Sequence, residues 1–456
     1  MTACIPQLGF DFHSTRRIEV AMDAPDTSSD GGLLLVRQLD ERRQVTDCLT
    51  SNITDKRDAR RVEFSVQELV RQRVYQIAAG YEDQNDAQTM RRDPVLRTAC
   101  DRSPSGEDWL GSQSTLSRLE NGVSARDVNR MRAALEDEWV ARLEPHRSVV
   151  VLDVDSTDDP THGHQQLSMF HGFYDQHMYH PLLVIDATTG DIATVLLRPG
   201  NAHAAAGASN VLCRLIRKVR QRLPNAMVIV RGDSAFAMPQ LLDRIEALCA
   251  TMGHVYYIVG LAKNARVLEL AKTLIDDAAV AWEAVGEPVR DFGEVRYGAK
   301  GWSRARRVIV KVEHNEKGAN PRFVVTSFPV MSAQSVYDYG YCARGAAENF
   351  IKDFKNAIDG DRLSCQSFLA NAFRTMLHLA AYRLLHGLRE TARELGLADL
   401  GRAQLDTLRL KVLKVAALVT QSARRILIRL PQSFPMAVAF QRIARALCAP
   451  HEPSTA

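Results

Sequence analysis

The sequence lacks the features that would mark a disulfide-bonded, zinc-binding or membrane protein. Its eight cysteines are irregularly spaced and none forms a C-x-x-C pair, so neither a disulfide framework nor a zinc site is expected. This cysteine usage fits a reducing, cytoplasmic environment. The N-terminal residues contain no basic start followed by an apolar run, so we expect no secretory leader. No stretch of about 18 apolar residues occurs, so we expect no membrane contact.

A large charge imbalance is also missing. The 456 residues include 58 Lys and Arg against 54 Asp and Glu, so the formal net charge of +4 does not identify a nucleic-acid-binding protein. The arginines are more informative because many are adjacent, and arginine suits bidentate contact with phosphate. Solvated helix faces are the alternative explanation. The adjacent arginines are Arg16-Arg17, Arg42-Arg43, Arg60-Arg61, Arg91-Arg92, Arg306-Arg307 and Arg424-Arg425.

Residues 1–145 have the apolar spacing of a mostly helical region. Within it, residues 112–122 combine a short polar start, apolar positions at helical spacing and a final glycine. This pattern indicates a recognition helix whose small polar side chains enter a major groove of DNA. An amphipathic helix with a capping serine is the alternative. The side chains expected to contact DNA are Gln113, Ser114, Thr115 and Arg118.

Two β-branched, apolar runs further along the chain end in aspartate. Residues 148–155 end at Asp155, and residues 227–233 end at Asp233. Both read as buried strands, which place a carboxylate at the edge of a sheet. Strands are also expected at 181–186 and 191–197, and helices near 264–276 and over 403–423. Two carboxylates brought close together repel each other unless a cation lies between them. Oxygen ligands without a histidine or cysteine cluster favour Mg²⁺ or Mn²⁺. Asp153 shares the parity of Asp155 on the strand and is its main rival.

A third carboxylate is expected from a helix that begins near residue 341. Tyr341, Arg344, Glu348 and Lys355 project within roughly a 60° arc at about 100° per residue, and Lys352 lies near the same arc. A helix face that meets the core would be apolar, so this face does not. The alternative is a solvated face with an Arg344–Glu348 ion pair.

Taken together, these segments resemble the DDE transposases of bacterial insertion sequences. The Y-(2)-R-(3)-E-(6)-K signature is met by the four residues from Tyr341 to Lys355, and the contexts of Asp155 (D-S-T) and Asp233 (R-G-D-S-A-F) match the two aspartates. Further segments resemble one branch, insertion-sequence family 1380. They are LDVDSTDDPTHG (152–163), LRPGNAHAAAG (197–207), VRGDSAF (230–236), GLAKN (260–264), NPRFVVT (320–326) and DTLRLKVLKVAALV (406–419).

The resemblance implies an α/β fold with a ribonuclease-H-like catalytic core. A mostly β insertion interrupts the core, and helical regions precede and follow it. The expected parts are a helical DNA-binding region (1–145), the first part of the core (146–254), the β-rich insertion (255–335), core helices that carry the glutamate (336–390), and a C-terminal helical region for DNA contact or dimerisation (391–456).

The resemblance also implies a function. Asp155, Asp233 and Glu348 would be catalytic and would bind two Mg²⁺ ions, for which Mn²⁺ may substitute. The reaction would be cleavage of double-stranded DNA at the terminal inverted repeats and strand transfer to target DNA, in a homodimer that pairs both ends. Tyr341, Arg344, Lys352 and Lys355 would contact DNA phosphates. A bacterial, nucleoid-associated location would follow from DNA binding.

Trp302 stands between basic residues of the insertion, which suggests an exposed ring that stacks on a flipped base. A packed tryptophan is the alternative. At the level of function, two other hypotheses use the same sequence. One is a metal-dependent nuclease that cuts DNA without rejoining it. The other is a DNA-binding protein with an inactive core, against which the three intact carboxylates argue.

Overall fold

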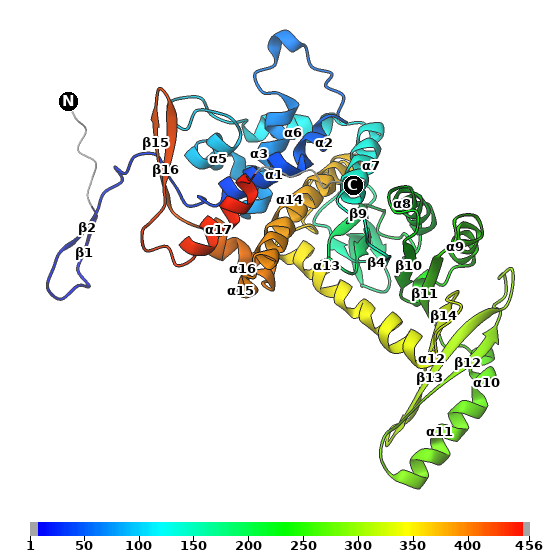
Figure 1. Cartoon of the computed structure of the whole chain (residues 1–456). Coiled ribbons are helices and arrows are strands. Elements are labelled where there is room, and N and C mark those ends of the chain that lie inside the picture. Colours follow the sequence, from blue (N-terminus) through cyan, green and yellow to red (C-terminus); the bar gives the residue numbers. More distant parts are fainter. Residues whose placement is uncertain (1–7, 450–456) are drawn as a thin grey trace, which may run out of the picture. The chain divides into compact units, whose positions relative to one another are not determined.

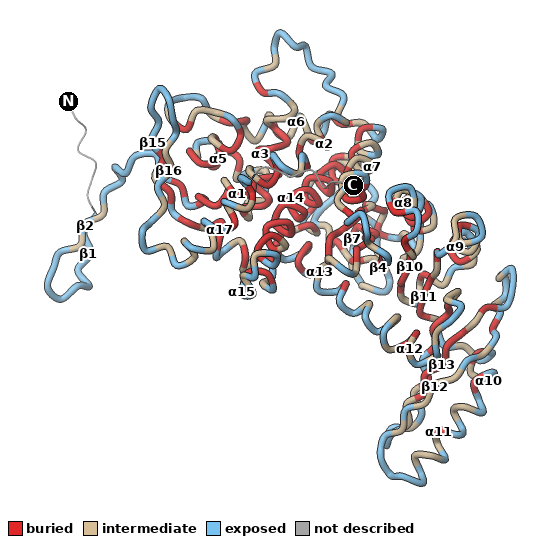
Figure 2. Tube along the Cα trace, viewed as in Figure 1, coloured by how far each residue is buried: buried red, intermediate tan, exposed pale blue. Residues whose placement is uncertain are grey.

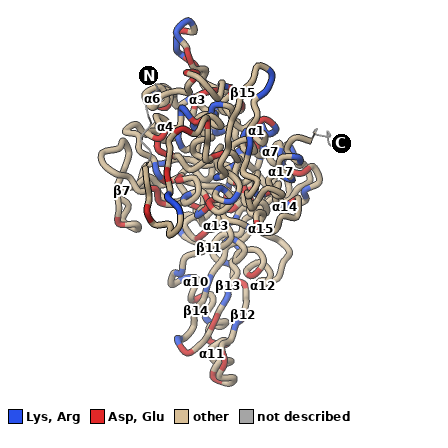
Figure 3. The backbone as a smooth tube through the Cα atoms, turned by 90° about the vertical axis from the view of Figure 1, so that its left-hand side faces the viewer, with Lys and Arg blue, Asp and Glu red and all other residues tan. Residues whose placement is uncertain are grey.

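The computed structural model describes residues 8–449, so part of the N-terminal stretch in which we expect no leader lies outside it. The chain forms two compact units, and each contains more than one segment of the sequence. Unit 1 consists of Met1–Thr46, Asp55–Leu119 and Leu384–Ala456, whereas unit 2 consists of Asp47–Thr54 and Glu120–Arg383. Charges of both signs are interspersed along the chain (Figure 3). In the described residues, no helix is both long and apolar enough to cross a membrane.

Unit 2 is built on an eight-stranded mixed sheet with the order β12-β13-β14-β11-β10-β4-β8-β9 (Figure 1). Strand β10 is parallel to both β4 and β11, and the other neighbours are antiparallel. The strands expected at 148–155, 181–186, 191–197 and 227–233 are confirmed. The strands of the sheet are β4 (Val149–Ser156), β8 (Leu182–Asp186), β9 (Ile192–Leu196), β10 (Met227–Gly232), β11 (Val255–Leu261), β12 (Val289–Tyr297), β13 (Arg306–Asn315) and β14 (Gly318–Thr326).

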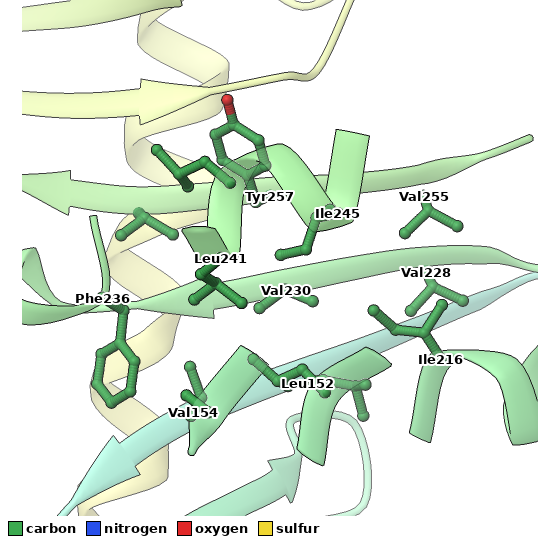
Figure 4. Packing of buried hydrophobic residues seen from close by; sticks show 14 of the residues in the cluster. Leu152, Val154, Ile216, Val228, Val230, Phe236, Leu241, Ile245, Val255 and Tyr257 are labelled. Carbon is green, nitrogen blue, oxygen red and sulfur yellow. The ribbon is translucent and has the colours of Figure 1, made fainter. Parts of the chain in front are cut away.

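Alternation along β4 and β10 gives the sheet one apolar face. Leu152 and Val154 of β4, with Val228 and Val230 of β10, are fully buried in one hydrophobic core cluster. Ile216 of α8 (Ala208–Arg222) and Leu241 of α9 (Pro239–Met252) cover this face in Figure 4. Both helices are amphipathic, and Figure 2 shows their buried sides alongside buried strands. Because side chains alternate along a strand, Asp153 and Asp155 lie on the opposite face.

The remaining elements of unit 2 surround this sheet. A small sheet has the order β5-β7-β6, and α7 contacts β9 and α8. Helices α2, α6 and α14 each contain a boundary between the two units. These elements are α2 (Val45–Thr50), α6 (Gln113–Gly122), α7 (Ala125–Ala141), β5 (Asp159–Pro160), β6 (Met169–His171), β7 (Gln176–Tyr179), α10 (Ala265–Leu270), α11 (Lys272–Val285), α12 (Ala333–Ser335), α13 (Ala346–Asn356) and α14 (Phe368–Glu394).

The segment expected to form a β-rich insertion extends the main sheet, since β14 pairs with β11 and β13 with β14. It also differs from expectation in two respects. The helix expected near 264–276 is two helices, α10 and α11. Strand β12 was not expected, because its sequence VRDFGEVRY carries four charges and a glycine. Charged residues are typical of an edge strand, which is the position of β12.

Unit 1 is mainly helical and also has a three-stranded sheet with the order β16-β15-β3. We expected a helix over 403–423, and this is wrong for its last part, which forms β15. The β-branched run AALVTQS pairs with both β16 and β3, so tertiary pairing overrides a helical apolar spacing. The elements are β1 (Leu8–Phe10), β2 (Ile18–Val20), β3 (Thr27–Ser28), α1 (Leu33–Arg43), a 3₁₀ turn (Ala59–Arg61), α3 (Val66–Ala79), a second 3₁₀ turn (Gln84–Asp86), α4 (Ala87–Met90), α5 (Pro94–Ala99), α15 (Ala398–Gly401), α16 (Leu405–Leu408), a π-helix (Arg409–Leu413), β15 (Ala417–Ser422), β16 (Arg425–Arg429) and α17 (Ala437–Cys448).

Candidate active site

The face of the sheet opposite α8 and α9 carries the acidic residues expected from the sequence. Arg231 of β10 is the register partner of Asp153 on β4, and Asp233 and Asp155 each follow two residues later. Asp155 and Asp233 therefore follow equivalent positions on neighbouring parallel strands. The strand ends bring these two aspartates to the same edge of the sheet.

Asp155 is largely buried, with 17% of its side chain exposed, and has two partners. Its Oδ1 accepts a hydrogen bond from the Ser156 amide at 2.9 Å, and its Oδ2 accepts one from Arg344 Nη1 at 3.0 Å. Burial raises the pKa of Asp155 to about 6 despite Arg344, and the charges of Asp233 and Glu348 also raise it. Asp233 and Glu348 therefore lie close enough to Asp155 to affect its pKa.

Asp233 lies immediately after β10 and caps the 3₁₀ turn Ser234–Phe236. Its Oδ1 accepts a hydrogen bond from the Ala235 amide at 2.9 Å. This bond uses one carboxylate oxygen to hold the turn and fixes the direction of the side chain. Asp233 is thus presented by a rigid strand end.

Asp153, the rival of Asp155, forms a buried, bidentate ion pair with Arg231. The Nε–Oδ1 and Nη2–Oδ2 distances are 2.6 and 2.7 Å. Arg231 Nη1 also donates to the Gly340 carbonyl at 2.9 Å. Asp153 and Arg231 therefore tie β4 and β10 to the segment that carries Tyr341. This ion pair engages both carboxylate oxygens of Asp153. Asp155, by contrast, lies near the carboxylates of Asp233 and Glu348.

The segment with the expected signature is helical, but it is not a uniform α-helix. Val336–Tyr341 form a π-helix, Cys342–Gly345 a 3₁₀ turn, and the α-helix α13 begins only at Ala346. An arc calculated at 100° per residue thus does not apply before Ala346. The alternative Arg344–Glu348 pairing is not what we find, since Arg344 binds Asp155. Departures from α-helical geometry are frequent at functional sites.

Helix α13 is fixed by packing against the turn between β8 and β9. An ideal Cβ on Gly190, where φ is +82°, would lie 2.1 Å from the Phe350 ring, so only glycine leaves room for this ring. The ring of Phe354 also packs edge-on against Tyr382 of α14. These contacts hold the helix turn that carries Glu348, whose side chain is exposed.

The two lysines of α13 differ in their surroundings. Lys352 is exposed, one turn after Glu348. Lys355 Nζ donates to Asp158 Oδ1 at 2.9 Å and lies 3.3 Å from Asp361 Oδ2. Burial acts to lower the pKa of Lys355, but its two acidic neighbours raise it. The structure therefore shows Lys355 engaged by protein carboxylates.

The insertion residues expected to contact DNA are mostly engaged within the protein. Trp302 is half-buried, not exposed, because its ring packs edge-on against Tyr297 at 5.5 Å and lies under the Arg306 guanidinium at 5.0 Å. Arg306 is buried and pairs with Glu246 at 2.8 Å, while Arg307 pairs with Glu294. In this structure, Arg306 and Arg307 therefore stabilise the fold through ion pairs with glutamates.

The helix expected over residues 112–122 is confirmed as α6 (Gln113–Gly122). Ser114 and Arg118 are exposed one turn apart, whereas Gln113 and Thr115 are half-buried. Gln113 donates to Gln84 at 3.3 Å, and Thr115 Oγ1 lies 3.0 Å from Ser112 Oγ. Ser114 and Arg118 are therefore the most accessible of the four side chains.

Tyr174, which lies in the loop between β6 and β7, was not predicted from the sequence. Burial raises the pKa of Tyr174, and so do the charges of Asp158 and Asp155, which places its phenol near the carboxylates. A lone tyrosine in a loop has no periodicity to single it out. Arg231 was missed in the same way, since its role depends on the register of β10 against β4.

The donor atoms at this edge are carboxylate oxygens, the ligands preferred by Mg²⁺ and Mn²⁺. Within residues 8–449, no group of three or more His, Cys, Asp or Glu side chains is arranged to hold a metal ion. The cation beside Asp155 in this structure is the Arg344 guanidinium. The donor chemistry therefore fits a divalent metal, provided that Arg344 withdraws from Asp155.

Comparison with known proteins finds similar solved structures and a matching family. The chain is similar to a piggyBac transposase, determined by cryo-EM as a synaptic complex with hairpin DNA, with a TM-score of 0.44 and 10% sequence identity over 93% of this chain and 83% of that one. No curated protein matches the sequence. The model of the family "Transposase DDE domain group 1" matches residues 10–450. The protein therefore belongs to this DDE transposase family.

Proposed function

We propose that this transposase binds the terminal inverted repeats of its own insertion sequence and moves it by cut-and-paste transposition, with Asp155, Asp233 and Glu348 as its D-D-E triad. The observation that carries the proposal is the environment of Asp155. It is a buried carboxylate at a strand end whose pKa is raised to about 6, in part by the charges of the other two acids. Perturbed acids of this kind are typical of functional sites.

We further propose that strands β9, β8, β4, β10 and β11 with helices α8 and α9 form a ribonuclease-H-like core. The mixed strand directions and the flanking helices support this assignment. Strands β12 to β14 would then be the insertion. We assign the chain to insertion-sequence family 1380, with Tyr341, Arg344, Glu348 and Lys355 as its Y-R-E-K signature, on the sequence segments that resemble this branch. The helical region 1–145 would bind DNA, and region 391–456 would bind DNA or a second protomer.

Asp155, Asp233 and Glu348 would hold two Mg²⁺ ions. When bound, these ions supply activation of the oxygen nucleophile and stabilisation of the leaving oxygen in an in-line displacement at phosphorus. The burial of Asp155 favours such a role, because a desolvated carboxylate gains more from a cation than an exposed one does. The raised pKa of Asp155 means that it reaches the ionised, metal-binding form only above about pH 6.

Arg344 and Tyr341 would bind the phosphate of the DNA end. Burial acts to lower the pKa of Arg344, but the charges of Asp155 and Tyr341 raise it, so Arg344 stays cationic. A guanidinium released from Asp155 would meet the non-bridging oxygens of a phosphate with matched geometry. Lys352 is exposed toward solvent and would add a phosphate contact. Lys355, held by Asp158 and Asp361, would orient the loop that follows β4.

A homodimer that pairs two element ends would place two such sites on one target DNA. The direct test is a joining assay with a labelled duplex that carries the terminal repeat, target plasmid and Mg²⁺. We expect labelled ends covalently joined to the plasmid, and loss of joining in Asp233→Asn. Cut ends without joined product, in Mg²⁺ and in Mn²⁺, would show a nuclease instead. Unchanged joining by Asp233→Asn would show that the triad is misassigned.

A further inference from the structure

Unit 2 has a second polar hollow beside the candidate active site. It is a pocket of about 530 Å³, and the residues of its lining that matter here are Ser234, Lys263, Lys311, Asn320, Arg322 and Tyr341. Ser234 directly follows Asp233, and Tyr341 belongs to the signature segment. The pocket therefore begins next to Asp233 and continues over strands β11, β13 and β14.

Gly260 of β11 lies close both to Tyr341 of the pocket and to Ser234, the residue after Asp233. An ideal Cβ on Gly260 would lie 2.7 Å from Tyr341 Oη and 2.9 Å from the Ser234 amide nitrogen. Only a residue without a side chain permits this close approach. A group bound in the pocket would thus lie next to a group bound at Asp233.

The charge of the pocket is positive and incompletely neutralised. Lys311 pairs with Glu313 and lies 5.6 Å from the centre of the Tyr337 ring. Lys263 donates to a neutral partner, Asn320, at 3.3 Å. Among the described residues, Arg322 makes no ion pair. Two cations are therefore left without an acid.

The strand register places two of the positive side chains of the pocket opposite each other. Lys311 and Arg322 are directly opposite each other on the antiparallel strands β13 and β14. Like charges in this position are destabilising, so a sheet selected only for stability would avoid them. Violations of such local rules concentrate at functional sites. A bound anion would relieve the repulsion.

A neighbouring hollow on the same strands shows the contrast. It is larger, about 630 Å³, and four arginines line it, three of which have an acidic partner. Arg304 and Arg306 pair with Glu246, both at 2.8 Å, and Arg307 pairs with Glu294. Neutralised cations of this kind serve the fold, whereas Lys263 and Arg322 remain available for a ligand.

We propose that the pocket beside Asp233 is a phosphate-binding subsite. It takes a backbone phosphate of the DNA strand close to the scissile one, and Lys263 and Arg322 are its donors. The inference rests on the proposed transposase function, because DNA is the phosphate-bearing substrate of that reaction. Tyr337 is not one of its ligands, since it is buried and its ring faces Lys311.

The test scans a terminal-repeat duplex with single methylphosphonates, which remove one phosphate charge at a time. For the wild type in Ca²⁺, we expect one position near the scissile phosphate to weaken binding about tenfold. The double variant Lys263→Ala, Arg322→Ala should bind unmodified duplex about tenfold more weakly, with a salt dependence smaller by about one phosphate contact. A methylphosphonate at the sensitive position should not weaken DNA binding by this double variant any further. Arg304→Ala is the matched control and should behave as the wild type.

Equal sensitivity of the wild type and the double variant at every position would refute the subsite. The proposal would also be overturned if the pocket were a site for free phosphate. In that case the wild type alone would broaden the ³¹P resonance of inorganic phosphate, and the double variant would bind DNA with an unchanged salt dependence. Both side chains are exposed, so unfolding of the variants is not expected. Joining by the wild type is measured separately, so failure of the subsite and failure of the proposed function are distinguishable.

Discussion

Replacing Asp155 by asparagine should stabilise the protein in the absence of metal, although it should abolish the reaction. Burial and the neighbouring acids raise the pKa of Asp155 from 3.8 to about 6. A raised pKa means that the folded state holds the proton more tightly than the unfolded state does. The associated stability is fully present below pH 3.8 and is lost as the pH rises through about 6.

The size of this effect follows from the rise of the pKa from 3.8 to about 6, which corresponds to about 3 kcal/mol. The asparagine variant keeps an oxygen for Arg344 and carries no titrating proton. Its free energy of unfolding, relative to that of the wild type, should therefore increase by about 3 kcal/mol between pH 4 and pH 7 and stay level at higher pH.

Urea denaturation of both proteins in EDTA, at intervals from pH 4 to pH 8, measures this difference. The matched control is Asp243→Asn, because hydrogen bonds from Ser303 and Arg306 lower the pKa of the Asp243 carboxyl and do not raise it. A difference between Asp155→Asn and the wild type that does not change with pH would refute the account of this site.

Three further changes have distinct expected outcomes. Asp153→Asn should lower the free energy of unfolding by about 3–5 kcal/mol, because it leaves Arg231 buried without its partner; a loss below about 1 kcal/mol in urea denaturation would contradict the assigned ion pair. Arg344→Gln should tighten Mn²⁺ binding about fivefold without DNA, since it removes a competing cation worth about 1 kcal/mol; calorimetric titration would count against this competition if affinity fell or did not change. Ser114→Ala with Arg118→Ala should alter the footprint on the terminal repeats and change stability by less than about 0.5 kcal/mol, because both side chains are exposed; an identical footprint would place recognition elsewhere.

The elements that carry the site were predictable because local sequence determines them. The apolar runs before Asp155 and Asp233 are strongly β-branched, and the structure confirms both strands. The polar face around Glu348 indicated that this side of the helix does not meet the core, and Glu348 is exposed on α13. Register and sheet order remained open, because they depend on pairing between distant segments.

The partners of the site residues could not be predicted, because they arise from that pairing. The sequence alone leaves Asp153 and Asp155 equivalent, and only the register of β10 reveals that Arg231 engages Asp153. Spacing along an ideal helix suggested an Arg344–Glu348 pair, whereas the π-helix and 3₁₀ turn before α13 direct Arg344 to Asp155. Trp302 looked available between basic neighbours, but Arg306 covers it.

The joining reaction tests the central claim most directly when it is combined with a metal-rescue experiment on the triad. Asp155→Cys, Asp233→Cys and Glu348→Cys should each join no detectable labelled ends in Mg²⁺, because a thiolate is a poor ligand for Mg²⁺. Mn²⁺, which accepts sulfur more readily, should restore joining in at least one of the three, whereas Asp153→Cys should show no such dependence on the metal. Undiminished joining in Mg²⁺ by any of the three variants would contradict the proposal that these carboxylates hold the catalytic metals.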